Sequence, residues 1–142
     1  MKDSLRQHFE ADLQLSSSAV SWLIDLWDVV QGFDDLTDSD PVDLNPLLWK
    51  ALIGLPANLF FSANAATLLP VMANALLKWK ASDTVERAGN ADAKSYVWRA
   101  SYYDVVLMVY LLCHGSDAAM KNADKVLSLY GETYDGYVKE FA

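Results

Sequence analysis

A chain of 142 residues with 53% apolar and 21% charged residues carries enough hydrophobic surface to fold, which excludes a disordered chain. Its formal net charge of −8 opposes direct binding to the phosphate backbone of a nucleic acid and favours a basic protein partner. The length suits one domain, and the apolar excess leaves surface for a partner or for a second copy, so a homo-oligomer is expected.

The opening residues MKDSLRQHFEADLQ lack the apolar stretch of a signal peptide. The longest uninterrupted apolar run, VVLMVYLLC, has nine residues, fewer than the roughly eighteen that a membrane-spanning helix needs. Cys113 is the only cysteine, so no intramolecular disulfide can form. These features predict a soluble, cytoplasmic protein without membrane association.

The first half of the chain shows the start and stop signals of helices. Three serines at positions 16–18 offer N-cap hydroxyls before AVSWLIDLWDVVQGF, and Ser39-Asp40-Pro41 ends that helix. Asn45-Pro46 begins a second helix over PLLWKALI, which Gly54-Leu55-Pro56 is expected to stop. In the first of these helices, one face at three- and four-residue spacing is expected to be buried: Leu23, Leu26, Val30 and Phe33.

The second half continues in the same pattern. A helix is expected from about Asn64 or Thr67 to Arg87, with Pro70 in its first turn or at a kink. Asn90 is expected to cap one long helix over residues 91–114, and Ser116-Asp117 a further one before a short amphipathic tail. No hairpin signal separates alternating strands. The predicted fold is all-α: a single-domain bundle of five or six helices over residues 1–142.

An acidic inter-helix segment near residues 34–45 contains five aspartates and no basic residue. Within it, Asp34-Asp35-Leu36-Thr37-Asp38 spells DDxxD, and carboxylates so spaced on a helix can hold a magnesium ion that bridges phosphate oxygens. These five residues are similar to the aspartate-rich motif of isoprenyl diphosphate synthases. The chain is much shorter than such enzymes and has no second aspartate-rich motif, so membership of that family is not predicted.

Two other interpretations of the aspartates remain open. Asp25, Asp28 and Asp35 lie opposite the expected apolar face, where an amphipathic helix places its solvated charges. The same negative surface could instead dock a basic partner.

Two carboxylates fall on expected apolar faces. Asp104 shares a side with Leu107, Met108 and Leu111, and Glu86 continues the stripe of the preceding helix. A buried carboxylate must be paired, hydrogen-bonded or protonated. If both point inward, they could join Asp34, Asp35 and Asp38 as metal ligands contributed by several helices. Alternatively, Asp104 pairs with another side chain and Glu86 lies beyond the packed stripe.

The expected helix over residues 91–114 also carries an aromatic and cationic stripe: Tyr96, Arg99, Tyr103, Tyr110 and His114. An arginine among tyrosines suits a phosphate or a partner's carboxylate, and it is equally typical of a helix interface. His114 beside Gly115 is also explained by the favourable position of a cation at a helix C-terminus.

Two functions follow from these observations. The leading hypothesis is a non-catalytic protein–protein interaction or self-associating protein without a cofactor, whose negative N-terminal third docks a basic partner. The alternative is a magnesium-dependent phosphate or diphosphate hydrolase with Asp34, Asp35, Asp38, Glu86 and Asp104 as ligands or base, and Arg99 on the phosphate. The sequence leaves open whether the protein is an enzyme.

Overall fold

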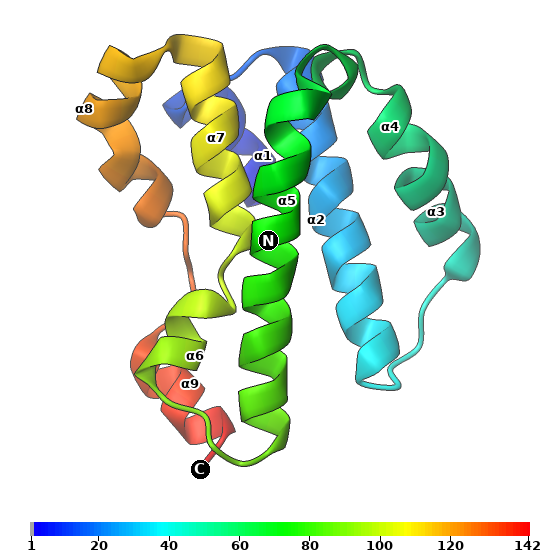
Figure 1. Cartoon of the computed structure of the whole chain (residues 1–142), viewed down its shortest axis with the longest axis vertical. Coiled ribbons are helices and arrows are strands. Elements are labelled where there is room, and N and C mark those ends of the chain that lie inside the picture. Colours follow the sequence, from blue (N-terminus) through cyan, green and yellow to red (C-terminus); the bar gives the residue numbers. More distant parts are fainter. Residues whose placement is uncertain (1) are drawn as a thin grey trace. The chain divides into compact units, whose positions relative to one another are not determined.

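A computed structural model describes residues 2–142, and across these residues it contains helices and turns and no strand (Figure 1). The all-α prediction is therefore confirmed, although the continuous helical stretches number eight rather than five or six. They are α1 (Lys2–Gln7) with the π-helical turn η1 (His8–Asp12), α2 (Ser17–Thr37), α3 (Leu44–Trp49) with η2 (Lys50–Gly54) and α4 (Leu55–Ala57), α5 (Leu59–Arg87), α6 (Ala93–Trp98), α7 (Tyr102–His114), α8 (Ser116–Leu127) and α9 (Tyr134–Glu140).

The described residues divide into two compact units, 2–65 and 66–142. The prediction of a single domain stays a prediction. The boundary falls inside α5, after Ala65. The preceding residue, Asn64, has backbone angles (φ −124°, ψ 15°) that depart from the helical region. α5 thus begins at Leu59, earlier than expected, and it ends at Arg87 as expected.

The first unit is built around α2, which contacts α1, η1 and the segment from α3 to α4. Phe9, Trp22 and Leu23 are fully buried there. The Trp22 ring stacks on Phe61, with centroids 5.4 Å apart. At Gly32, a Cβ atom would lie only 2.7 Å from Leu47 Cδ1, so a glycine here allows α3 to approach α2 closely.

The buried face of α2 differs from the prediction in its last turns. Leu23 and Leu26 are buried, but Phe33 is 49% exposed. Beyond Val29, the 41–50 segment covers the side of α2 that carries Asp28 and Gly32 instead. The expectation that Phe33 belongs to the core is therefore wrong.

The predicted stop at Gly54-Leu55-Pro56 is also wrong. Gly54 (φ −60°, ψ −49°) and Leu55 (φ −64°, ψ −52°) adopt helical angles, and the chain remains helical to Ala57. Glycine permits a turn without requiring one, and here Leu55 is buried and holds the segment in place. The break comes at Asn58, whose side-chain nitrogen donates to the carbonyl of Ser18 at 3.0 Å.

In the second unit, α7 packs against α8, and α6 lies beside α9 (Figure 1). The single helix expected over residues 91–114 is divided into α6 and α7 by a turn at Arg99–Ser101. The Ser101 hydroxyl donates to the carbonyl of Ala75 on α5 at 2.6 Å, which fixes the chain at this turn. α6 is capped by Asp92 rather than by Asn90, because Asp92 and Ser95 form a reciprocal capping box.

The orientation of α7 also differs from the prediction. Val105, Val106 and Val109 are buried, whereas Leu107 is 41% exposed. The periodicity of VVLMVYLLC is ambiguous because apolar residues occupy every side of this helix. Asp104 therefore lies beside the core face rather than on it.

α5 is long and apolar enough to cross a membrane, judged by length and composition alone, with an 18-residue window of mean hydropathy 1.4. The length of uninterrupted apolar runs did not predict this property. Residues 59–77 contain no charged residue, but small neutral residues divide them into short apolar runs. Core helices of soluble proteins can have the same composition.

Candidate functional site

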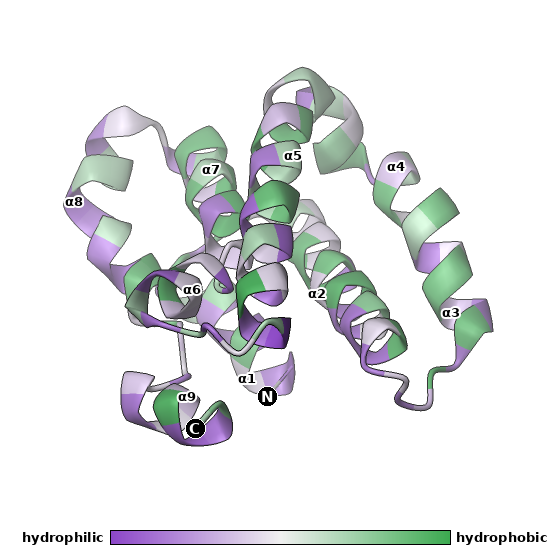
Figure 2. Ribbon diagram, turned by 60° about the horizontal axis from the view of Figure 1, so that its bottom comes forward, coloured by the Kyte–Doolittle hydropathy of each residue, from purple (hydrophilic) through white to green (hydrophobic). Residues whose placement is uncertain are grey.

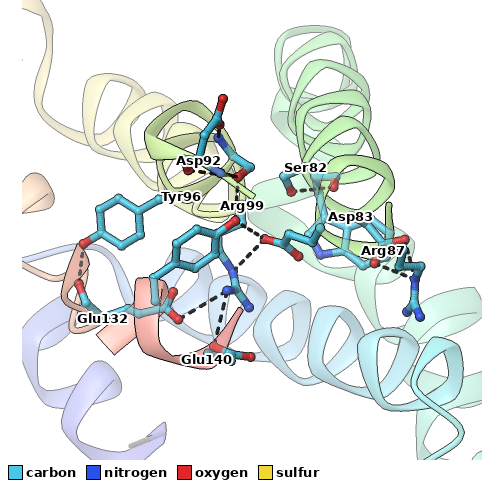
Figure 3. A network of polar contacts seen from close by, with 12 residues as sticks. Ser82, Asp83, Arg87, Asp92, Tyr96, Arg99, Glu132 and Glu140 are labelled. Atoms are coloured by element: carbon cyan, nitrogen blue, oxygen red, sulfur yellow. Dashed lines mark hydrogen bonds and ion pairs between the residues drawn. The ribbon is translucent and has the colours of Figure 1, made fainter. Parts of the chain in front are cut away.

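Arg99 stands at the centre of a polar network in the second unit (Figure 3). Its Nε atom lies 3.6 Å from Glu86 Oε2 at the end of α5. Its Nη1 atom lies 3.4 Å from Glu132 Oε1 and 3.6 Å from Glu140 Oε2, which are ion-pair distances without hydrogen-bond geometry. The guanidinium carbon is 5.0 Å from the centre of the Tyr137 ring, a cation–π contact.

Tyr137 connects the same network to α6. Its hydroxyl donates to Glu86 Oε2 at 2.8 Å and lies 2.5 Å from the Ser95 hydroxyl. Both Tyr137 and Ser95 are buried. Three segments that are distant in the sequence, the end of α5, the start of α6 and α9, therefore meet through one tyrosine.

Burial and neighbouring charges shift the pKa values of these groups. Burial raises the pKa of Glu86, against the opposing effects of the Tyr137 hydrogen bond and the Arg99 charge. Burial also raises the pKa of Tyr137 to about 12, and its hydrogen bond to Glu86 acts in the same direction. Burial alone would lower the pKa of Arg99, but the surrounding carboxylates of Glu86, Glu132 and Glu140 raise it. The arginine is thus a permanent cation whose charge is already neutralised.

A cluster of tyrosines extends from this network. Tyr96 stacks on Tyr130 with ring centroids 5.3 Å apart, and its hydroxyl donates to the carbonyl of Glu132 at 2.6 Å. The Tyr130 hydroxyl donates to Glu132 Oε2 at 2.8 Å, and burial raises its pKa. Tyr103 joins the cluster through Tyr130, 5.8 Å away. These contacts attach the segment before α9 to α6.

The predicted stripe is divided by the turn at Arg99–Ser101. Tyr96, Arg99 and Tyr103 belong to the network just described. Tyr110 and His114 lie further along α7 and contact each other, with ring centroids 4.7 Å apart. The five residues are therefore carried by two helices and the turn between them rather than by one helix.

Asp104 and Glu86, the two carboxylates that were expected to point inward at the predicted metal site, are held separately. Asp104 accepts from Lys78 Nζ at 2.8 Å, whereas Glu86 bonds to Tyr137 and pairs with Arg99. Lys78 precedes Glu86 by two turns of α5, about 12 Å along the helix axis. Among residues 2–142, no group of three or more His, Cys, Asp or Glu side chains is placed to hold a metal ion.

In the first unit, the face of α2 that was expected to be solvated is partly covered. Asp28, 21% exposed at its side chain, pairs with Lys50 Nζ at 2.5 Å and with Lys2 Nζ at 3.2 Å. Beside it lies an open pocket of about 240 Å³ between the end of α2 and residues 41–50. Asp35 and Asp43 add carboxylates to its lining, while Asp34 and Asp38 lie outside it.

The outer side of the segment from α3 to α4 is an apolar surface. In the fourteen residues LNPLLWKALIGLPA, Lys50 is the only charged residue, and its ion pair with Asp28 directs it toward α2. Figure 2 shows the predominance of hydrophobic residues along this segment. Five large apolar side chains are each 46–68% exposed, and they form what we call the outer face: Leu44, Leu48, Trp49, Leu52 and Ile53.

The negative charge is concentrated in the same unit. Residues 1–65 contain ten acidic and three basic residues, a formal charge of −7, whereas residues 66–142 contain nine acidic and eight basic residues, a charge of −1. The outer face therefore belongs to the strongly acidic half of the chain.

Comparison of the chain with protein families, with characterised proteins and with solved structures found no match.

The sequence interpretation did not identify the outer face. Its signal was present: a helical segment with one charge in fourteen residues is apolar on all sides, and such a helix is normally buried. Tyr137, Glu132 and Glu140 were also missed, because they contact Arg99 from positions more than thirty residues away in the sequence.

Proposed function

We propose that the chain is a non-catalytic helical protein that binds another protein through the outer face of α3–α4. The observation that carries this proposal is the direction of Lys50. An ordinary surface helix turns its charges to water and its apolar side inward. Here the single charge of the segment is paired with Asp28, and five large apolar side chains remain in solvent.

The amount of exposed apolar surface supports the proposal. Monomeric proteins carry scattered exposed leucines, but contiguous apolar patches mark contact sites. The five residues recur at four- and five-residue spacing, so they lie along one side of the helical segment. A tryptophan in such a position is typical of an interface anchor.

The polar network around Arg99 fits a structural role in this proposal. Every charged group in it has a partner of opposite charge, and its tyrosine hydroxyls bond to carbonyls or carboxylates. A site that binds phosphate needs donors directed at the ligand, whereas this arginine is shared among Glu86, Glu132 and Glu140.

Photocrosslinking tests the proposal. A benzophenone amino acid replaces Leu52 on the outer face, or Lys94 as an exposed control in the other unit, and the full chain is irradiated in its native cells. We expect a protein adduct of defined mass from position 52 and none from position 94. Sedimentation of the purified chain distinguishes a second copy from a different partner. Absence of an adduct from positions 48, 49 and 52 alike would overturn the proposal.

A further inference from the structure

The proposed function leaves the partner open, and the charge around the outer face identifies its class. The face spans residues 44–53, about 15 Å of helix, which matches roughly three turns of a partner helix. The apolar residues of the outer face require an apolar side on the partner. The acidic residues beside the outer face require positive charge on the partner.

The acidic neighbours lie at the end of the outer face where α3 begins. Asp40 and Asp43 are exposed in the connection that leads into α3. Asp43 also lines the open pocket with Asp35, and the apolar wall of that pocket includes Leu47 of α3 itself. A partner that covers the outer face therefore places one end beside the carboxylates of Asp40 and Asp43.

The charge balance disfavours two other occupants. Two copies of this chain would bring together two units of charge −7, which repel each other. An anionic lipid surface would be repelled for the same reason. A helix that bears lysine or arginine residues would be attracted.

We infer that the outer face of α3–α4 receives a basic amphipathic helix from another protein. Its apolar side packs on Leu48, Trp49 and Leu52. Its lysine or arginine side chains, at one end, meet the exposed carboxylates of Asp40 and Asp43. This inference rests on the proposed function and specifies the chemistry of the partner.

A synthetic peptide tests the inference. The probe is a fluorescein-labelled helix of about 18 residues with leucines on one side and lysine and arginine on the other, titrated with the full chain and followed by fluorescence anisotropy. One control peptide carries glutamate in place of each basic residue, and another has the same composition scrambled so that no apolar side forms. We expect only the first peptide to bind, and its affinity to fall as salt rises.

Variants of the chain separate the two parts of the surface. W49S/L52S removes two exposed apolar side chains and should weaken peptide binding at least about tenfold. D40N/D43N should weaken it about three- to tenfold and reduce its salt dependence. The matched control D117N/D124N removes the same charge from exposed positions of α8 and should leave binding unchanged. Circular dichroism and melting curves verify that each variant is folded.

Several results would overturn the inference. They are equal binding of the glutamate peptide, binding that W49S/L52S leaves unchanged, and binding of the chain to zwitterionic vesicles but not to the basic peptide. If position 52 crosslinks to a protein but no peptide binds, this inference is wrong and the proposed function still stands. Absence of crosslinking would remove both.

Discussion

At the scale of single residues, Tyr137 links three segments of the second unit. Its buried hydroxyl satisfies the Glu86 carboxylate and the Ser95 hydroxyl at once. When one side chain of a buried hydrogen-bond network is removed, the remaining polar groups lose their partners. The loss in stability is then larger than the net contribution of one hydrogen bond.

Replacement of Tyr137 by phenylalanine should therefore lower the free energy of unfolding by about 1–3 kcal/mol. Urea denaturation followed by circular dichroism measures the change. Tyr134→Phe is the control, because Tyr134 is exposed, and it should stay within about 0.5 kcal/mol of the wild type. Equal effects of the two substitutions would contradict a special role for the Tyr137 hydroxyl.

The raised pKa of Tyr137 also predicts a dependence of stability on alkaline pH. An unfolded tyrosine loses its proton near pH 10, whereas Tyr137 in the folded protein keeps it to about pH 12. The folded state thus binds more protons in this window, so stability is full below pH 10 and falls as the pH rises toward 12. Urea midpoints measured across this range should fall more steeply for the wild type than for Tyr137→Phe. Parallel curves would show that another group is responsible.

Sequence periodicity identified Glu86 and Arg99 as unusual positions, and both lie in the network. It could not identify their partners, because Tyr137 is 51 residues from Glu86. A helical pattern tells which side of a helix a residue occupies, and it contains no information on which distant segment covers that side. Glu86 and Asp104 were grouped for this reason, although each has its own cation.

At the scale of elements, the ion pair of Lys50 with Asp28 sets the rotation of α3–α4 on α2. Both apolar sides of this segment could in principle pack inward, since Leu47 and Leu55 differ little in character from Leu48 and Leu52. The lysine resolves this ambiguity, because Asp28 offers it a partly covered carboxylate.

Lys50→Ala should destabilise the protein by about 1 kcal/mol, since it leaves Asp28 with only the exposed Lys2 as partner. Lys2→Ala is the matched control and should cost at most about 0.5 kcal/mol. Chemical denaturation provides both values. A Lys50→Ala variant as stable as the wild type would mean that apolar contacts alone orient the segment.

The all-α fold class could be predicted from the sequence. Capping residues, glycines and prolines also predicted several helix ends, such as the C-terminal ends of α2, α5 and α7. The break between α6 and α7 did not, because it depends on a serine that bonds to a carbonyl of α5. Tertiary contacts of this kind override local propensity. Gly54 shows the reverse case, where a residue that commonly ends helices lies within one.

At the scale of the whole molecule, the uneven charge makes the first unit sensitive to salt. A formal charge of −7 in 65 residues repels itself, and added ions screen that repulsion. We expect the melting temperature to rise by a few degrees between about 20 mM and about 200 mM sodium chloride. No rise would indicate that the aspartates are already compensated.

Magnesium separates the leading hypothesis from the hydrolase alternative. At matched ionic strength, a non-catalytic protein should show the same melting temperature in magnesium chloride as in sodium chloride, apart from general screening. A further increase with magnesium that Asp35→Asn abolishes would support specific metal binding instead, through mass action on the folded state.

Because the charge of Lys50 is directed toward α2, the solubility of the first unit depends on the nearby aspartates. Their negative charge makes the molecules repel one another, although the apolar outer face is exposed to solvent. As a solution is acidified toward the isoelectric point of about 4.5, this repulsion vanishes while the outer face stays exposed. We therefore expect the protein to aggregate near that pH, which turbidity measures. Purification is therefore best carried out well above that pH.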